Sequence, residues 1–210
     1  TVTEDFNHDI ELFSPKFLEK TRVISWGIEY DFFSKYNKNE ILKLKHYFKI
    51  PESKKIILSY RNLRPLYNIE TLIEAFKIIQ SEGIDFYGVV LSGYSSNDYI
   101  KQIEQLIKDN DLQDKVIIIK ELVSRDVIRV LLNMSHITIN IPLSDGLLAS
   151  LLEAMSSRSI PVCSNLDTYK SYFSNNVNGG VLLNNKSKEE LSRLIMKYLN
   201  IDKIVKTNNT

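Results

Sequence analysis

Hydrophobic residues gather in seven short runs along the chain, separated by longer stretches of a different periodicity. The runs are rich in Ile and Val and alternate little with polar residues; they span 21–25, 54–60, 86–92, 115–120, 136–141, 160–164 and 180–183. Strands that are buried on both faces have this pattern, which favours a parallel sheet. We therefore expect a parallel sheet of about six strands with helices on both faces.

The stretches between the runs have helical periodicity. Apolar residues recur three or four positions apart in three series: Ile69, Leu72, Ile73, Phe76 and Ile79; Ile100, Ile103, Leu106 and Ile107; and Leu191, Leu194, Ile195 and Tyr198. This spacing is typical of helices that bury one face. Ser187, followed three residues later by Glu190, predicts a capping box at the start of the last helix.

Repeated strand–helix units predict an α/β domain with a doubly wound, mostly parallel, Rossmann-like sheet. The chain has 210 residues, a length that suits a single domain, which we place at residues 21–199. Residues 1–20 are polar and irregular and are interpreted as the remnant of an interdomain connection, and residues 200–210 as a polar tail. Ligands of such sheets bind at the carboxyl ends of the strands, which directs attention to the loops that follow them.

Composition narrows the class of protein. Lys and Arg number 27 against 26 Asp and Glu, so the basic excess of a nucleic-acid-binding domain is missing. Cys163 is the single cysteine, and His8, His46 and His136 lack metal-ligand spacing, so we expect no disulfide and no metal site. We also expect no signal peptide, no membrane-spanning segment and a reducing, cytoplasmic location. The basic stretch 38–49 is interpreted as a solvated helix face.

Two arginines follow the predicted strand 54–60, in the loop before the first long helix. The planar guanidinium group of arginine suits phosphate because it makes two charge-assisted hydrogen bonds. Arg61 and Arg64 are therefore candidate phosphate ligands. The alternative is that both are solvated loop charges.

A second candidate segment, 143–155, follows the predicted strand 136–141 and opens a helix. Gly146 allows close approach of the backbone to a ligand. Three free N–H groups at the start of this helix are candidates to face an anion, those of Leu147, Leu148 and Ala149.

Two acids mark the same segment, Asp145 before the helix and Glu153 about two turns along it. Carboxylates accept hydrogen bonds only, so they suit the paired hydroxyls of a sugar. The alternative is that Asp145 is an N-cap and Glu153 a solvated residue.

Gly93 follows the predicted strand 86–92 and permits a tight turn over a ligand, although an ordinary turn between a strand and a helix is the better explanation. The chain contains neither the dinucleotide fingerprint G-x-G-x-x-G nor the P-loop pattern. His136 is interpreted as a packed core histidine, and no nucleophile–histidine–acid arrangement is visible.

Four segments together resemble the donor-binding C-terminal domain of retaining glycosyltransferases of the GT-B fold, the group 1 or family 4-like enzymes. The resemblance covers residues 21–199. Its segments are VISWGIEYDFF, with a glycine–hydrophobic–acid triplet; LSYRNLRPLYNIETLIEAF; SDGLLASLLEAM, with two acids separated by seven residues; and IPVCSNLDTYKSYFSNNVNGGVLL.

The resemblance implies roles for these residues. Arg61, with Arg64 in place of the family's loop lysine, would hold the diphosphate. Asp145 and the backbone of 146–149 would bind the transferred sugar and the phosphate, and Glu153 the ribose. The base would lie near Lys120–Leu122, with Glu121 and Leu122 as the candidate contacts, held largely by backbone. The chain departs from the family at Tyr60 and Arg158, where glycine is usual, and at Asp145, where Glu is commoner.

The implied activity is transfer of a hexose from a nucleoside diphosphate sugar to an acceptor hydroxyl with retention, as in polysaccharide biosynthesis. No cofactor is implied beyond the donor substrate. An N-terminal acceptor domain would be missing, and with it any peripheral membrane association and most of the activity. The alternatives are a non-catalytic nucleotide-sugar-binding domain and a sugar-nucleotide epimerase of the same fold.

Overall fold

The structure, a computed structural model, describes residues 10–12, 14–22, 27–146, 149–173, 181–183 and 187–200. Six strands in this part of the chain form one sheet in the order β3-β2-β1-β4-β5-β6, and every neighbouring pair is parallel. The strands are β1 (Ile56–Ser59), β2 (Tyr87–Leu91), β3 (Val116–Ile119), β4 (Ile137–Asn140), β5 (Ile160–Ser164) and β6 (Val181–Leu183). The predicted parallel sheet is therefore confirmed.

The seventh predicted strand, 21–25, has a different outcome. Thr21 and Arg22 belong to no strand, and residues 23–25 lie outside the described residues. Thr21 instead closes a 3-10 helix, because its N–H and its hydroxyl both donate to the carbonyl of Leu18.

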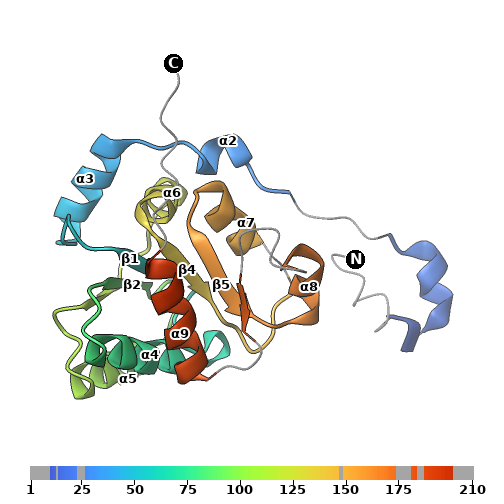
Figure 1. Cartoon of the computed structure of the whole chain (residues 1–210). Helices are drawn as coiled ribbons and strands as arrows, with labels where there is room; N and C mark the ends of the chain where they lie inside the picture. Colours follow the sequence, from blue (N-terminus) through green and yellow to red (C-terminus); the bar gives the residue numbers. More distant parts are fainter. Residues whose placement is uncertain are drawn as a thin grey trace.

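Helices connect the strands and cover both faces of the sheet (Figure 1). They are η1 (Pro15–Lys20), α2 (Tyr30–Phe33), α3 (Lys38–Tyr47), η2 (Pro65–Tyr67), α4 (Ile69–Ser81), α5 (Asn97–Asp109), α6 (Arg125–Met134), α7 (Ala149–Ser156), α8 (Asp167–Phe173) and α9 (Lys188–Leu199). The Ser187 cap of α9 is present: its hydroxyl accepts from the N–H of Glu190 at 3.0 Å.

The core has two layers because successive residues of a strand point to opposite faces. On one face, Ile57 and Val90 pack with α4, α5 and α9. On the other, Ile56, Leu58 and Val89 pack with α2, α3, α6 and the buried side of α7. The helical series predicted from the sequence thus lie on α4, α5 and α9, on one side of the sheet.

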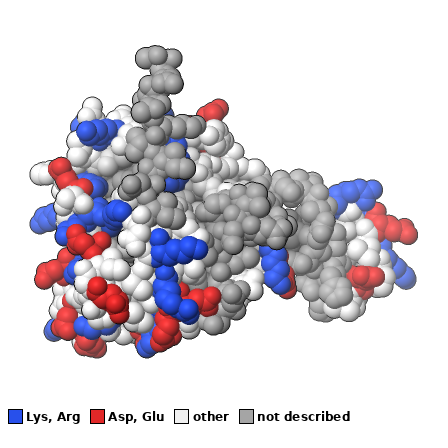
Figure 2. Space-filling model, in the orientation of Figure 1, with Lys and Arg blue, Asp and Glu red and all other residues white. Residues whose placement is uncertain are grey.

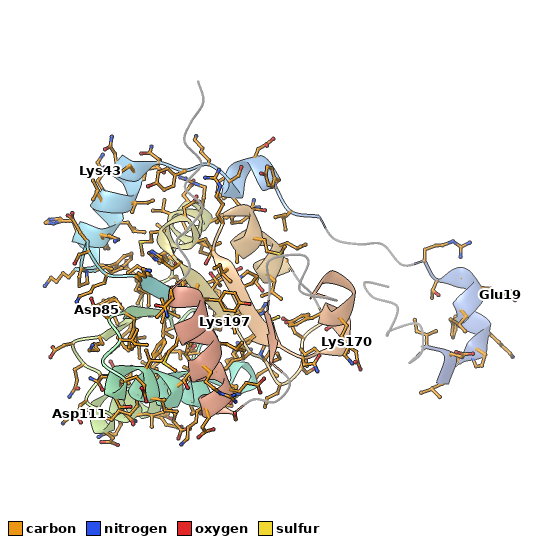
Figure 3. All side chains as sticks on the ribbon, in the orientation of Figure 1. Glu19, Lys43, Asp85, Asp111, Lys170 and Lys197 are labelled. Carbon is orange, nitrogen blue, oxygen red and sulfur yellow. The ribbon has the colours of Figure 1, made fainter. Side chains whose placement is uncertain are left out.

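Helix α3 corrects the interpretation of 38–49 as a solvated face. Lys43 projects outward (Figure 3), but Lys45 is only 8% exposed, and its Nζ donates to the carbonyl of Glu52 at 2.8 Å. Glu40 pairs with the buried Arg129 of α6 at 2.7 Å. One side of α3 therefore packs against the domain and is held by buried cations.

Charges of both signs are scattered over the surface visible in Figure 2 and form no field of one sign. The helices within the described ranges are too short or too polar to cross a bilayer.

The close contact between β2 and α4 yields a stability prediction. A Cβ on Gly88 would lie 2.7 Å from Cε2 of Phe76 and 3.2 Å from Cγ2 of Val116, and Phe76 is fully buried. Gly88→Ala should lower the free energy of unfolding by about 1–3 kcal/mol in urea titrations. Relief of glycine's entropy in the unfolded chain, about 0.4–1 kcal/mol, is too small to offset the clash. Gly27→Ala is the control, since its Cβ meets nothing within 4 Å; equal stability of the two variants would contradict the packing argument.

Candidate functional site

Two loops meet at the carboxyl ends of β1 and β4, which are neighbours in the sheet. The first carries Arg61, the second residue after β1, and the second carries Asp145, between β4 and α7. Nη1 of Arg61 lies 3.3 Å from Oδ2 of Asp145 and donates to Oγ of Ser150, in the first turn of α7, at 3.1 Å. Two segments singled out separately in the sequence are thus brought together.

The Arg61 guanidinium is enclosed but keeps free hydrogen-bonding capacity. Its side chain is 22% exposed, Nη2 donates to the hydroxyl of Tyr67 at 2.8 Å, and the group lies 4.6 Å from the centre of the Tyr67 ring. Burial alone would lower the pKa of Arg61, but the Tyr67 hydrogen bond and the Asp145 charge outweigh it and raise the pKa. Hydrogen bonds to described residues use two of the five guanidinium N–H groups, and Nη1 also faces the Asp145 carboxylate, so part of the group is left for a ligand.

Asp145 is also held by α8, through the same oxygen that faces Arg61. Its side chain is 10% exposed, and Oδ2 accepts from the hydroxyl of Tyr169 at 2.7 Å. Burial first, and then this hydrogen bond, raise the pKa of Tyr169, so the phenol remains a donor. Asn140, at the end of β4, donates from Nδ2 to the Tyr169 hydroxyl at 3.2 Å and to Oγ of Ser150 at 3.3 Å. The Asp145 carboxylate is therefore fixed by a connected network.

Glu153 lies on α7, one turn beyond Ser150, and is half-buried. The hydroxyl of Tyr60 donates to Oε2 of Glu153 at 2.9 Å and to the carbonyl oxygen of Ser150 at 2.6 Å, so the two acceptors share one proton. Burial raises the pKa of Glu153, and the Tyr60 hydrogen bond with the charges of Arg125 and Arg61 opposes part of that rise. The carboxylate thus sits in the same site as Arg61, at an energetic cost.

The loop after β2 borders this site. Gly93 has φ +54°, and a Cβ there would lie 1.9 Å from Oδ1 of Asn62, so the turn requires glycine. The N–H of Tyr94 donates to the same Asn62 oxygen at 3.3 Å. Arg64 is exposed, and its Nη2 donates to the carbonyl of Tyr94 at 3.3 Å. Arg64 therefore joins the β1 and β2 loops and makes no described contact with Asp145.

Two of the remaining predicted residues, Glu121 and Leu122, make no described contact with Arg61, Asp145 or Glu153. Glu121 and Leu122 are exposed after β3, and the hydroxyl of Tyr47 donates to Oε2 of Glu121 at 3.4 Å. Gly146 and Ala149 are partly buried on either side of Leu147 and Leu148, which lie outside the described residues.

His136 lies at the opposite, amino-terminal edge of the sheet, where its Nδ1 accepts from the N–H of Ile56 at 3.2 Å. The described ranges contain no group of three His, Cys, Asp or Glu residues arranged to hold a metal ion.

Sequence reasoning missed five members of the site: Tyr60, Tyr67, Asn140, Ser150 and Tyr169. Tyr60 and Asn140 carried a usable signal, since each is a polar group at the carboxyl end of a buried strand. Tyr169 carried none, because it belongs to a separate helix with no pattern pointing to the site.

Several solved structures share this fold. A glycosyltransferase from Rickettsia africae ESF-5 matches with a TM-score of 0.81 and 20% identity over 93% of this chain and 51% of its own. WaaG, a glycosyltransferase involved in lipopolysaccharide biosynthesis, matches with 0.79 and 17% over 96% and 53%. Anabaena Alr3699/HepE, in complex with UDP-glucose, matches with 0.76 and 18% over 87% and 49%. No curated protein matches the sequence.

The chain spans about half the length of these glycosyltransferases. The likeness confirms the predicted fold, a Rossmann-like half of the GT-B architecture. The family described as "Glycosyl transferases group 1" matches residues 41–209, most of the chain. The chain therefore belongs to the glycosyl transferases group 1 family, as the resemblance of its motifs predicted.

Proposed function

We propose that the chain is the donor-binding half of an enzyme that transfers a hexose from a nucleoside diphosphate sugar to an acceptor hydroxyl, with retention of the anomeric configuration. The observation that carries this proposal is the convergence of Arg61, Asp145 and Glu153 around the start of α7. A cation for a diphosphate and two acids for sugar hydroxyls thus lie around the first turns of α7, at the sheet edge where such ligands bind.

Arg61 would bind the diphosphate. Its free N–H groups, and the amino-terminal end of α7 beside it, favour an anion, and they would stabilise the negative charge that develops as the sugar leaves. Asp145 shares the same guanidinium at 3.3 Å. A bound diphosphate and Asp145 would therefore both accept hydrogen bonds from the N–H groups of Arg61.

The two acids would then bind different parts of the donor. Asp145, near Arg61, would contact the hydroxyls of the transferred hexose. Glu153, one turn further along α7 than Ser150, would bind the ribose. The base would lie toward Glu121 and Leu122, beyond the Gly93 turn.

The acceptor would be bound by a second domain. The chain spans about half the length of the three glycosyltransferases compared above, and one of these was crystallised with UDP-glucose. A single half supplies one wall of the site, so we expect this chain alone to bind donor weakly and to catalyse little or no transfer.

The first functional prediction concerns Arg61. Arg61→Ala should weaken binding of the nucleoside diphosphate selected by a thermal-shift panel by about 1.5–3 kcal/mol, because a charge-assisted hydrogen bond is lost. Isothermal titration calorimetry measures the change, and Arg64→Ala should have a smaller effect. Arg193→Ala, which removes an exposed arginine of α9, is the control. Parent-like affinity in a folded Arg61→Ala variant would refute the role.

The second concerns Glu153. The parent chain should bind a ribonucleoside diphosphate about 10–100-fold more tightly than its 2′-deoxy analogue, the range expected for one charge-assisted hydrogen bond. Glu153→Gln keeps the size and one acceptor oxygen but removes the charge, so it should discriminate less. Equal affinity of the parent for ribo and 2′,3′-dideoxy nucleotides would mean that Glu153 is not the ribose ligand.

The third concerns stability. Because the pKa of Glu153 is raised in the folded chain, ionising it costs folding free energy. The contribution is unfavourable above the unfolded pKa of Glu, about 4.3, and disappears as pH falls below it. Urea titrations should therefore show Glu153→Gln gaining stability over the parent as pH rises from 4 to 7. A difference that stays constant with pH would contradict the burial of an ionised group.

A further inference from the structure

The hydroxyl of Tyr60 points at the acid that the proposed function assigns to the ribose. Tyr60 follows the last residue of β1 and precedes Arg61, while Glu153 lies on α7, and the hydrogen bond of 2.9 Å is a direct link between their side chains. The phenol is the donor, since a carboxylate and a carbonyl oxygen only accept, and its single proton is shared between Oε2 of Glu153 and the carbonyl oxygen of Ser150, 2.6 Å away. A glycine at position 60 would leave this carboxylate without its donor.

The contact fixes one oxygen of the carboxylate and leaves the other. Tyr60 donates to Oε2, and Oε1 accepts no hydrogen bond from the residues that the structure describes. The same hydroxyl also donates to the carbonyl oxygen of Ser150 at 2.6 Å, one turn before Glu153 on α7. The phenol therefore links the side chain of Glu153 to the backbone of the same helix.

We propose that Tyr60 is a positioning residue, whose hydroxyl holds the Glu153 carboxylate in the orientation that offers Oε1 to the ribose of the donor. The inference rests on the proposed function, in which Glu153 binds the ribose. It adds a residue that touches no substrate and acts through the carboxylate.

The same hydrogen bond bears on whether Glu153 is ionised. Burial raises the pKa of Glu153, and the groups that counter it are, in order, the Tyr60 hydroxyl, the Arg125 guanidinium on α6 and Arg61. The pKa of Tyr60 is itself raised well above its ordinary value, by burial and by Glu153, so its proton stays in place. Removing the hydroxyl should therefore raise the pKa of Glu153 further.

The other elements packed against α7 add no comparable charge. Helix α2 carries Tyr30 and Asp31, β5 carries the buried Cys163, and β4 carries no titratable side chain. None of these groups contributes to the shift in the pKa of Glu153.

A competing role for Tyr60 makes the opposite prediction. If the phenol merely occupied Glu153, a ribose would have to displace it, and its removal would strengthen binding. If it positions Glu153, its removal weakens the ribose contact, because the freed carboxylate must be ordered by the ligand.

Tyr60→Phe separates the two, and Tyr99→Phe is the matched control because it removes a buried hydroxyl on α5. Calorimetry compares a ribonucleoside diphosphate with its 2′-deoxy analogue from pH 4 to 8. In Tyr60→Phe the preference for ribose should fall by about two- to tenfold, the range for one neutral-donor hydrogen bond. The preference for ribose should also develop at a higher pH than in the parent, because Glu153 ionises at a higher pH. Tyr99→Phe should match the parent in both respects.

A second readout needs no ligand. The carboxyl carbon signal of Glu153, assigned by its loss in Glu153→Gln, should titrate at higher pH in Tyr60→Phe than in the parent. If Tyr60→Phe does not fold, the labelled ζ-carbon of Tyr60 in the parent must shift as Glu153 titrates.

The outcomes distinguish the inference from the proposed function. A parent chain that binds no nucleoside diphosphate, or does not distinguish ribose from deoxyribose, overturns the proposed role of Glu153 and the inference with it. A parent that prefers ribose, with unchanged preference and unchanged titration in Tyr60→Phe, overturns the inference alone. Stronger ribonucleotide binding by Tyr60→Phe likewise rejects a positioning role.

Discussion

The ion pair between Arg61 and Asp145 is the interaction on which the candidate site depends. In the sheet order β3-β2-β1-β4-β5-β6, the chain proceeds outward from β1 in one direction and then returns to add β4 on the other side. The loops after β1 and β4 therefore lead to helices on opposite faces of the sheet, and a crevice is expected where they diverge. Arg61 and Asp145 span that point at 3.3 Å and define its two sides.

The pair matters more for positioning the side chains of the site than for stabilising the fold. Enclosing a guanidinium and a carboxylate costs desolvation, which is offset only when both also have hydrogen-bond partners. Arg61 donates hydrogen bonds to Tyr67 and Ser150, and Asp145 accepts one from Tyr169. Side chains held on several sides lose little further freedom when a ligand arrives, which favours binding to a preformed site.

Much of this arrangement could be predicted from the sequence, for identifiable reasons. The buried strands were predictable because they are Ile- and Val-rich runs. Because the carboxyl ends of parallel strands lie at one edge of the sheet, Arg61 and Asp145 could be predicted to lie at the same edge. Tyr169 was out of reach because its contact with Asp145 depends on how α8 packs, which no periodicity encodes. The prediction that Lys45 is solvated was wrong because a basic stretch is usually exposed, and the sequence does not show that the carbonyl of Glu52 accepts a hydrogen bond from this side chain.

The two polar residues of β4 have a mechanical consequence for the domain. Asn140 donates to Ser150 at the start of α7, and Thr138 shares a hydrogen bond of 2.7 Å with Ser159, just beyond its end. A helix tied at both ends to alternate residues of one strand can neither slide along the sheet nor roll about its axis without breaking a bond. The position of α7 along β4 is therefore set by side chains as well as by packing, and a shift of the helix relative to the sheet would cost at least one of these hydrogen bonds.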